Sequence, residues 1–237
     1  MEYFFKYFRQ RVMNIRALGS VEAPRVQGYA GSMLGEQLIL ATSGIDTLAS
    51  HWARVWPISG PKGSLSHAER MSRFLANHGD AAIWSRVAIP HLFRDGSIAP
   101  AFLERVSKLP LVWTGPARQR KYSDDSLLAE LRRQLAPITS AEDECLCKHT
   151  YGSILYRKYR CVWIHRGGGP GGSEPIWGEL RDDEPYYKNW SEADGGTKRV
   201  LVLPINLLLC TYECAIESLE RACVAERRDP EVGLDSD

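Results

Sequence analysis

The sequence predicts an all-α protein, a bundle of four to six helices with a small β-rich insertion before the last helix. Three long stretches, 34–55, 140–165 and 204–225, repeat apolar residues at the three- and four-residue spacing of an amphipathic helix. The stretch 176–203 lacks this period and contains aromatic and β-branched runs that are typical of short strands. Helices that each bury one apolar stripe pack naturally as a bundle.

The first 18 residues, MEYFFKYFRQRVMNIRAL, form an aromatic and basic segment that fits an amphipathic helix. Lys6, Arg9 and Arg11 interrupt the apolar stretch that a secretory signal would need. We favour a terminal helix whose aromatic face docks on the protein's own core. The alternative is a helix that lies on a membrane surface or on a partner. This helix and its linker are expected to occupy residues 1–32.

The stripe from Leu34 to Val55 is the clearest period in the chain, and it ends before Pro57. Asp46 interrupts this stripe. Its carboxylate either faces solvent, which we favour, or orients Arg160 or His165 from across the bundle. Shorter helices are expected over 67–78, 80–93, 101–108 and 124–135.

Local start signals support several of these helices. Ser66 is a suitable N-cap for the helix over 67–78. Thr139 and Glu142 form a capping-box pattern, which predicts one continuous helix from residue 140 to about His165. Pro204 suits the first turn of the last helix.

Between the last two long helices, short strands are expected around Tyr186–Trp190 and Arg199–Leu203, with a turn near Gly195 and Gly196. No charge block marks a boundary, so the sequence predicts a single helical domain over 33–228. The polar tail over 229–237 is expected to be disordered.

The composition excludes several classes of protein. Thirty basic and 29 acidic residues give a net charge of +1, which excludes a strongly basic nucleic-acid coat but leaves room for a local basic patch. No apolar run approaches the length of about 18 residues that an ordinary membrane-spanning helix needs. The nucleophile elbow, the Walker loop and the zinc-protease motif are all absent.

The six cysteines all follow residue 140: Cys145, Cys147, Cys161, Cys210, Cys214 and Cys223. Cys145, Cys147 and His149 form a C-x-C-x-H cluster, but no C-x-x-C pair accompanies it, so we predict neither a metal site nor a cofactor. We interpret the cysteines as reduced core thiols, and the protein as cytoplasmic.

One cluster of cations stands out, in the segment Arg157-Lys-Tyr-Arg160-Cys-Val-Trp-Ile-His165-Arg166. Arginines bind phosphate oxygens, and an imidazole moves a proton, so this group suits a phosphodiester. With RNA, the attacking group can be the substrate's own 2′-hydroxyl, and neither a metal nor a protein nucleophile is required. On an α-helix, Arg160 and His165 would lie about 140° apart.

The segment from Arg160 to His165 resembles the R-x4-6-H motif of the HEPN superfamily, metal-independent ribonucleases of toxin–antitoxin, CRISPR-associated and antiphage systems. The resemblance implies a helical bundle that forms a homodimer, in which Arg160 and His165 of two subunits build one endoribonuclease site. It also implies that Arg157, Lys158 and Arg166 bind RNA such as tRNA, and that a partner protein of a defence or toxin–antitoxin system regulates the enzyme. Cys161 stands where the family often has a polar residue.

Other interpretations stay open. The chain could be a catalytically inactive helical interaction subunit, or an antitoxin-like partner of a defence complex, which would not depend on His165. It could also be a membrane-surface protein whose first 18 residues and Arg157–Arg166 bind lipid headgroups. Finally, Arg157 and Arg160 could form an ordinary solvated face. As nuclease residues, Arg160 and His165 are expected to be partly exposed, so that alanine at either position costs at most about 1 kcal/mol of stability.

Overall fold

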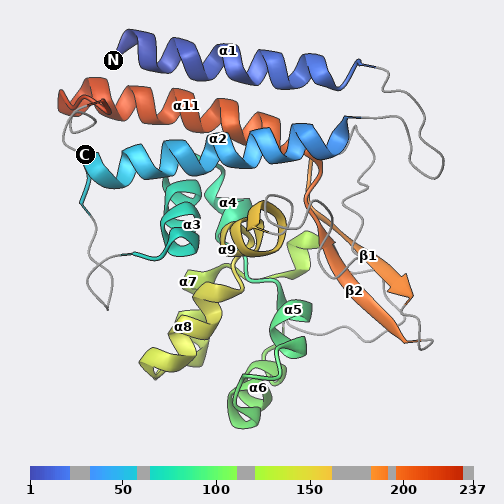
Figure 1. The fold of residues 1–237 in the computed structure, drawn as a ribbon. Coiled ribbons are helices and arrows are strands. Elements are labelled where there is room, and N and C mark those ends of the chain that lie inside the picture. Colours follow the sequence, from blue (N-terminus) through green and yellow to red (C-terminus); the bar gives the residue numbers. More distant parts are fainter. Residues whose placement is uncertain (22–32, 58–64, 111–120, 162–182, 192–195, 232–237) are drawn as a thin grey trace.

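The computed structural model of this chain describes residues 1–21, 33–57, 65–110, 121–161, 183–191 and 196–231. This part of the chain is mostly helical and has one small antiparallel sheet before the last helix, as the sequence predicts. Three long helices, α1 (Glu2–Leu18), α2 (Leu34–Val55) and α11 (Ile205–Glu226), each pack on the other two. Figure 1 shows this three-helix bundle with the shorter helices and the hairpin on one side of it.

The apolar stripes of α2 and α11 are confirmed as the centre of the core. Along α2 the buried stripe residues are Leu38, Ala41, Ile45, Leu48 and Trp52. Along α11 they are Ile205, Leu208, Leu209, Tyr212, Ile216, Leu219 and Cys223. Each set follows the helical period, so burying it against the facing helices removes a continuous apolar surface from water.

The N-terminal helix α1 docks on this core, as favoured from the sequence. Its buried face consists of Phe4, Phe5, Phe8, Val12 and Ile15. Ion pairs of Arg9 with Glu220 and of Arg16 with Glu213 connect its edge to α11. In the described parts of the chain, no helix is long and apolar enough to cross a membrane.

Residues 229–231, from the predicted tail, contact the start of the chain and α2. The amino group of Met1 lies 2.8 Å from Glu231 Oε2, and His51 Nδ1 lies 2.9 Å from the Pro230 carbonyl. Residues 232–237 of that tail lie outside the described residues.

The next four helices are α3 (His67–His78), α4 (Ala81–Trp84), α5 (Ile89–Arg94) and α6 (Pro100–Ser107). Ser66 caps α3 as predicted, within a full capping box with Glu69. The prediction of one continuous helix over 80–93 is wrong. The chain is extended at Arg86 and Val87, which form bridge pairs with Leu127 and Thr150, and Pro90 then lies in the first turn of α5.

A short 3-10 turn (Tyr122–Asp124) precedes α7 (Leu128–Leu135), α8 (Ser140–Lys148) and α9 (Tyr151–Ile154). The helix expected over 124–135 therefore begins four residues later than predicted, at Leu128. The predicted capping box of Thr139 and Glu142 is present at the start of α8.

The prediction of a single helix over 140–165 is also wrong, because α8 ends at Lys148 and its C-cap is His149. There the Ala88 N–H donates to the His149 carbonyl at 2.9 Å, and the Thr150 side chain caps a new helix by accepting from the Ser153 N–H. The new helix continues from α9 into η2 (Leu155–Arg160), which is a π-helix, and residues 162–165 lie outside the described residues.

The hairpin consists of β1 (Tyr186–Ser191) and β2 (Thr197–Val202), paired antiparallel from Tyr186↔Val202 to Ser191↔Thr197. Both strands were predicted. The Tyr187 and Tyr151 hydroxyls donate to the buried carboxylate of Asp125, so the hairpin and α9 share one acceptor. The Tyr159 hydroxyl also donates to the Leu201 carbonyl, at 2.6 Å.

The apolar core has two parts. One lies within the three-helix bundle and extends to α3, α9 and β2, and the other lies among α5, α6, α7 and α8. The buried side chains of α9 and η2 belong to the first part.

Candidate functional site

Arg160, at the end of η2, faces α2 and contacts Asp46. Its Nη2 lies 3.2 Å from Asp46 Oδ2, and its guanidinium lies over the Tyr156 ring, 5.3 Å from the centroid. Asp46 is only 7% exposed, so the solvent-facing interpretation of this residue is wrong. The Arg160 side chain is 23% exposed, which leaves the fixed guanidinium within reach of solvent.

A second arginine, Arg70 of α3, shares the same carboxylate. Its Nη2 lies 3.5 Å from Asp46 Oδ1, and the same nitrogen is 2.7 Å from His67 Nδ1. Because an arginine only donates, His67 Nδ1 must accept, and the ring proton lies on Nε2. The His67 ring in turn stacks on Tyr156 at 5.9 Å. We call Asp46, Arg70, Arg160, Tyr156 and His67 the Asp46 cluster.

The Asp46 cluster carries excess positive charge and incomplete hydrogen bonding. Two guanidinium groups face one carboxylate. Among the described residues, Asp46 Oδ1 and the Nε atoms of Arg70 and Arg160 are buried without a hydrogen-bond partner. Most buried polar groups in proteins are hydrogen-bonded, so these three atoms can accept a further partner, either a bound ligand or water.

The π-helix separates the cations that the sequence places together. Arg160 contacts Asp46 of α2, whereas Arg157 and Lys158 line a pocket on the other side of η2. Segments of π-helix occur often at functional sites. The angle of about 140° expected between Arg160 and His165 stays a prediction, because residues 162–165 lie outside the described residues.

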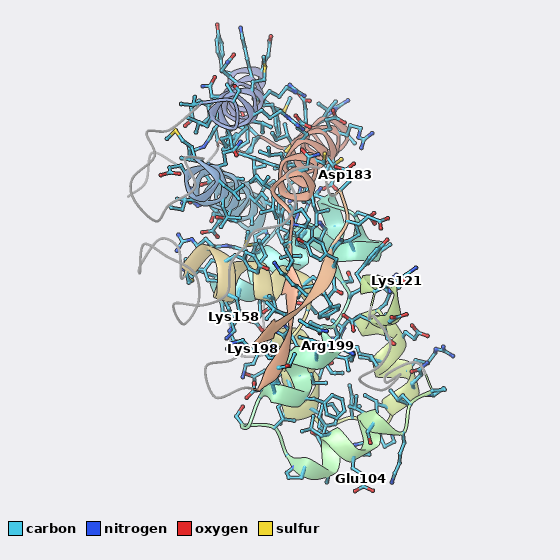
Figure 2. The ribbon with its side chains drawn as sticks, turned by 90° about the vertical axis from the view of Figure 1, so that its right-hand side faces the viewer. Glu104, Lys121, Lys158, Asp183, Lys198 and Arg199 are labelled. Atoms are coloured by element: carbon cyan, nitrogen blue, oxygen red, sulfur yellow. The ribbon has the colours of Figure 1, made fainter. Side chains whose placement is uncertain are left out.

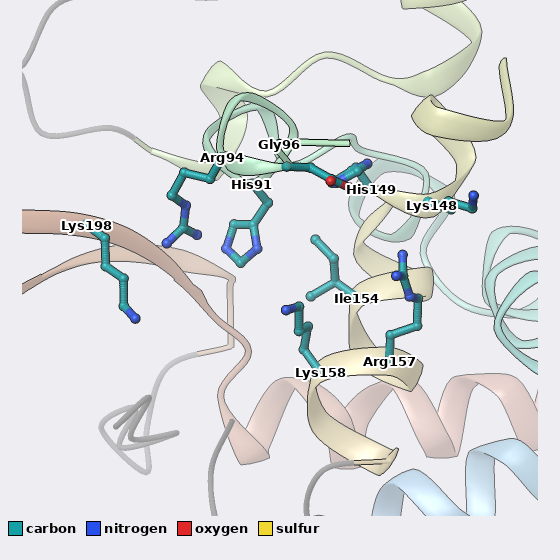
Figure 3. A pocket seen from close by; sticks show the side chains of 10 residues that line it. His91, Arg94, Gly96, Lys148, His149, Ile154, Arg157, Lys158 and Lys198 are labelled. Atoms are coloured by element: carbon teal, nitrogen blue, oxygen red, sulfur yellow. The ribbon is translucent and has the colours of Figure 1, made fainter. Parts of the chain in front are cut away.

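The pocket that Arg157 and Lys158 line has a volume of about 460 Å³ and lies between the two parts of the core. Figure 3 shows its walls: α5 with the residues that follow it, the end of α8, the α9–η2 helix, and β2. In Figure 2, Lys158 and Lys198 lie close together on the hairpin side of the molecule, below the three-helix bundle. The described residues that line the pocket are His91, Arg94, Asp95, Gly96, Lys148, His149, Ile154, Arg157, Lys158 and Lys198.

Two buried histidines belong to this wall. His91 Nε2 accepts a hydrogen bond from the Leu201 N–H at 3.2 Å, and burial with the nearby cations holds the pKa of His91 well below its usual value. His149 Nδ1 lies 2.8 Å from the Cys145 carbonyl, and its Nε2 lies 3.4 Å from Asp95 Oδ2. Burial lowers the pKa of His149 as well, against the opposing effects of that carbonyl and Asp95.

The predicted site residues thus fall into three groups. Arg160 belongs to the Asp46 cluster, Arg157 and Lys158 belong to the pocket, and His165 and Arg166 lie outside the described residues. Sequence reasoning missed Arg70, His91, Arg94, Lys148 and Lys198. No local pattern marks these residues, because they are isolated charges and one histidine spread over α3, α5, α8 and β2.

The cysteines are free thiols, as interpreted from the sequence, but only Cys223 is buried in the core. Burial raises the pKa of the Cys145 and Cys147 thiols. Within the described residues, no group of three or more His, Cys, Asp or Glu side chains could hold a metal ion.

Comparisons of the chain with protein-family models, with curated proteins and with solved structures find no match.

Proposed function

We propose that this protein is a metal-independent endoribonuclease of the HEPN type, in which Arg160 binds the scissile phosphate and His165 transfers protons. The observation that carries the proposal is the arrangement of Arg160. Its guanidinium is held by a buried carboxylate and an aromatic ring, lies beside a second arginine and remains partly exposed. A cation fixed before the substrate arrives stabilises developing negative charge without reorganisation.

The proposed reaction uses the RNA itself as the nucleophile. The 2′-hydroxyl oxygen attacks the adjacent phosphorus, the bond from phosphorus to the 5′-oxygen breaks, and one proton moves from the 2′-oxygen to the leaving 5′-oxygen through imidazole. The products are a 2′,3′-cyclic phosphate and a 5′-hydroxyl. Arg160, with Arg70 beside it, neutralises the charge on the non-bridging oxygens. Arg157, Lys158 and Arg166 are proposed to bind further phosphates of the RNA.

The proposal includes the remaining expectations of the resemblance. The active form is a homodimer in the cytoplasm in which each site uses Arg160 and His165 pairs from both subunits. Its biological role is that of a toxin or of an antiphage effector controlled by a partner protein.

The decisive experiment compares purified wild-type protein with His165→Ala and Arg160→Ala, using labelled total RNA and tRNA in excess EDTA. Arg133→Ala is a matched control, because Arg133 is exposed on α7 and lies outside the Asp46 cluster and the pocket. We expect the wild type and Arg133→Ala to leave 2′,3′-cyclic phosphate ends and the other two variants to leave the RNA intact. Equal cleavage by wild type and His165→Ala would refute the mechanism.

A second candidate function, a catalytically inactive interaction subunit, is favoured by the outer face of α1. Tyr3 is 83% exposed, Tyr7 58% and Met13 63%, although the opposite face of the same helix is fully packed. Exposed apolar side chains on one helix face are typical of a surface that a partner covers. RNA that stays intact with the wild-type dimer would favour this function over the nuclease.

A further inference from the structure

The pocket on the far side of η2 from Arg160 is built from residues that are far apart in the sequence. Arg94 comes from α5, Lys148 from α8, Arg157 and Lys158 from η2, and Lys198 from β2. The cavity of about 460 Å³ falls within the range of roughly 300–1,000 Å³ that small-molecule sites occupy. Such sites are usually lined by apolar and aromatic groups. Here Ile154 has the one apolar side chain among the described lining residues.

The charge of the lining is strongly one-sided. Among the described lining residues, five carry cationic side chains and one, Asp95, carries a carboxylate. That carboxylate already accepts hydrogen bonds from the Ser97 N–H at 3.0 Å and the Ser97 hydroxyl at 2.6 Å. Lys148 is paired with Glu144 at 2.9 Å, but Arg157 and Lys158 make no ion pair with any described residue. Bringing these cations together costs free energy that a bound polyanion would offset.

His91 adds a hydrogen-bond donor to the same wall. Because its Nε2 accepts from the Leu201 N–H, the neutral ring carries its proton on Nδ1. The ring is nine-tenths buried, and within the described residues Nδ1 makes no hydrogen bond. Figure 3 shows the His91 ring at the pocket between Arg94 and Lys158. A neutral imidazole supplies a donor here without adding to the repulsion among the cations.

We infer that this pocket binds a compact polyphosphate group, two or more linked phosphates, through Arg94, Lys148, Arg157, Lys158 and Lys198 with the Nδ1–H of His91. Several cations around one half-open pocket match several adjacent phosphates better than one phosphodiester. No Phe, Tyr or Trp is among the described lining residues, so this part of the lining offers no platform on which a base would stack. The ligand is therefore recognised by its phosphates, and the inference does not depend on RNA cleavage.

The test is isothermal titration of the full-length protein with inorganic tripolyphosphate in EDTA at moderate ionic strength. Lys158→Gln and Arg157→Gln are compared with Lys108→Gln and Arg133→Gln, which remove the same charges from exposed positions on or next to α6 and α7. We expect each pocket variant to weaken binding roughly tenfold or more, the loss for one charge-assisted hydrogen bond, and each control to bind like the wild type. Absence of wild-type binding, or equal losses in the controls, would overturn the inference.

His91 provides a second and sharper pair of variants. His91→Asn keeps a donor near the position of Nδ1, whereas His91→Gln keeps an acceptor near Nε2 and loses the donor. We expect His91→Asn to bind tripolyphosphate more tightly than His91→Gln, with circular dichroism used to confirm that both variants fold. The opposite order would exclude the donor role, and the Lys158 result stands if neither variant folds.

The polyphosphate group could belong to a free polyphosphate or to the 5′-triphosphate end of an RNA. Two further titrations distinguish these sources, using the same short RNA with either a 5′-triphosphate or a 5′-hydroxyl. Tripolyphosphate binding without a preference for the 5′-triphosphate RNA assigns the pocket to a free polyphosphate. A preference that Lys158→Gln abolishes assigns it to the triphosphate end of an RNA. Equal binding of both RNAs, weakened equally by Lys158→Gln, would place internal phosphodiesters of RNA in the pocket. That is the role which the proposed function gives to Arg157 and Lys158, and this outcome would refute the polyphosphate inference. Because the readout is binding, failure of RNA cleavage leaves this test intact.

Discussion

The carboxylate of Asp46 and the guanidinium of Arg160 form a contact of 3.2 Å between α2 and η2, more than one hundred residues apart in the sequence. The carboxylate is nearly buried, and Arg70 approaches it from the other side. This contact fixes the one predicted catalytic residue that the structure describes. Its consequences can be tested in activity and in stability.

In the RNA cleavage reaction, Asp46→Asn is expected to lower kcat strongly and to change KM much less. The amide keeps the shape but loses the charge that positions Arg160, and small misplacements of a catalytic group cost on the order of 10²-fold in rate. Asp143→Asn is the matched control, because Asp143 pairs with Arg132 at 2.6 Å in an exposed position on α8. A loss of the same size in Asp143→Asn, or a change in KM alone, would contradict a positioning role for Asp46.

Arg160→Ala is expected to destabilise the fold by roughly 1–3 kcal/mol, because it leaves the buried Asp46 with only Arg70 at 3.5 Å. This exceeds the limit of about 1 kcal/mol expected from the sequence. Arg132→Ala, which breaks a more exposed pair, is expected to cost less than about 1 kcal/mol. Denaturant unfolding of the two variants measures the difference, and equal costs would show that Asp46 does not need Arg160.

Acidification is expected to destabilise the protein through His78. Burial lowers the pKa of His78 to about 4 from an ordinary value of 6.5, and Nδ1 lies 3.1 Å from the Ser218 hydroxyl. The unfolded chain therefore binds a proton at His78 more readily than the folded protein does. The contribution of neutral His78 to the free energy of unfolding is complete above pH 6.5 and is lost as the pH falls from 6.5 to 4. It amounts to about 3 kcal/mol at most.

His78→Asn removes this titration and is expected to flatten the pH dependence of the unfolding free energy between pH 6.5 and 4. A part of the dependence should persist, because the pKa values of His51, His91 and His149 are lowered by burial too. An unchanged slope in the variant would show that His78 is not protonated on unfolding in this range.

Gly44→Ala is expected to destabilise the three-helix bundle by about 1–3 kcal/mol. A Cβ at Gly44 would overlap the hydroxyl and the ring of Tyr212, a fully buried residue of α11. The gain of about 1 kcal/mol in helix propensity does not offset this overlap. Gly96→Ala, where a Cβ would meet no atom within 4 Å, is the control and is expected to stay within about 0.5 kcal/mol of the wild type.

The stripes of α2 and α11, the capping signals at Ser66 and Thr139, and the two strands of the hairpin were all predictable from the sequence. Each depends on residues that are neighbours within one or two turns, so the pattern in the chain is itself the cause of the local structure. For the same reason α1 could be assigned to the core from its aromatic spacing.

The tertiary structure alone decided where the long central helix breaks and which charges meet. The break at His149 depends on a hydrogen bond from Ala88, some sixty residues earlier. Asp46 is buried because Arg70 and Arg160 reach it from two other helices. A carboxylate with no cation nearby would have stayed in water. The pocket likewise unites cations from four separate elements. Contacts between distant residues depend on how the helices pack, and no periodicity along the chain encodes them.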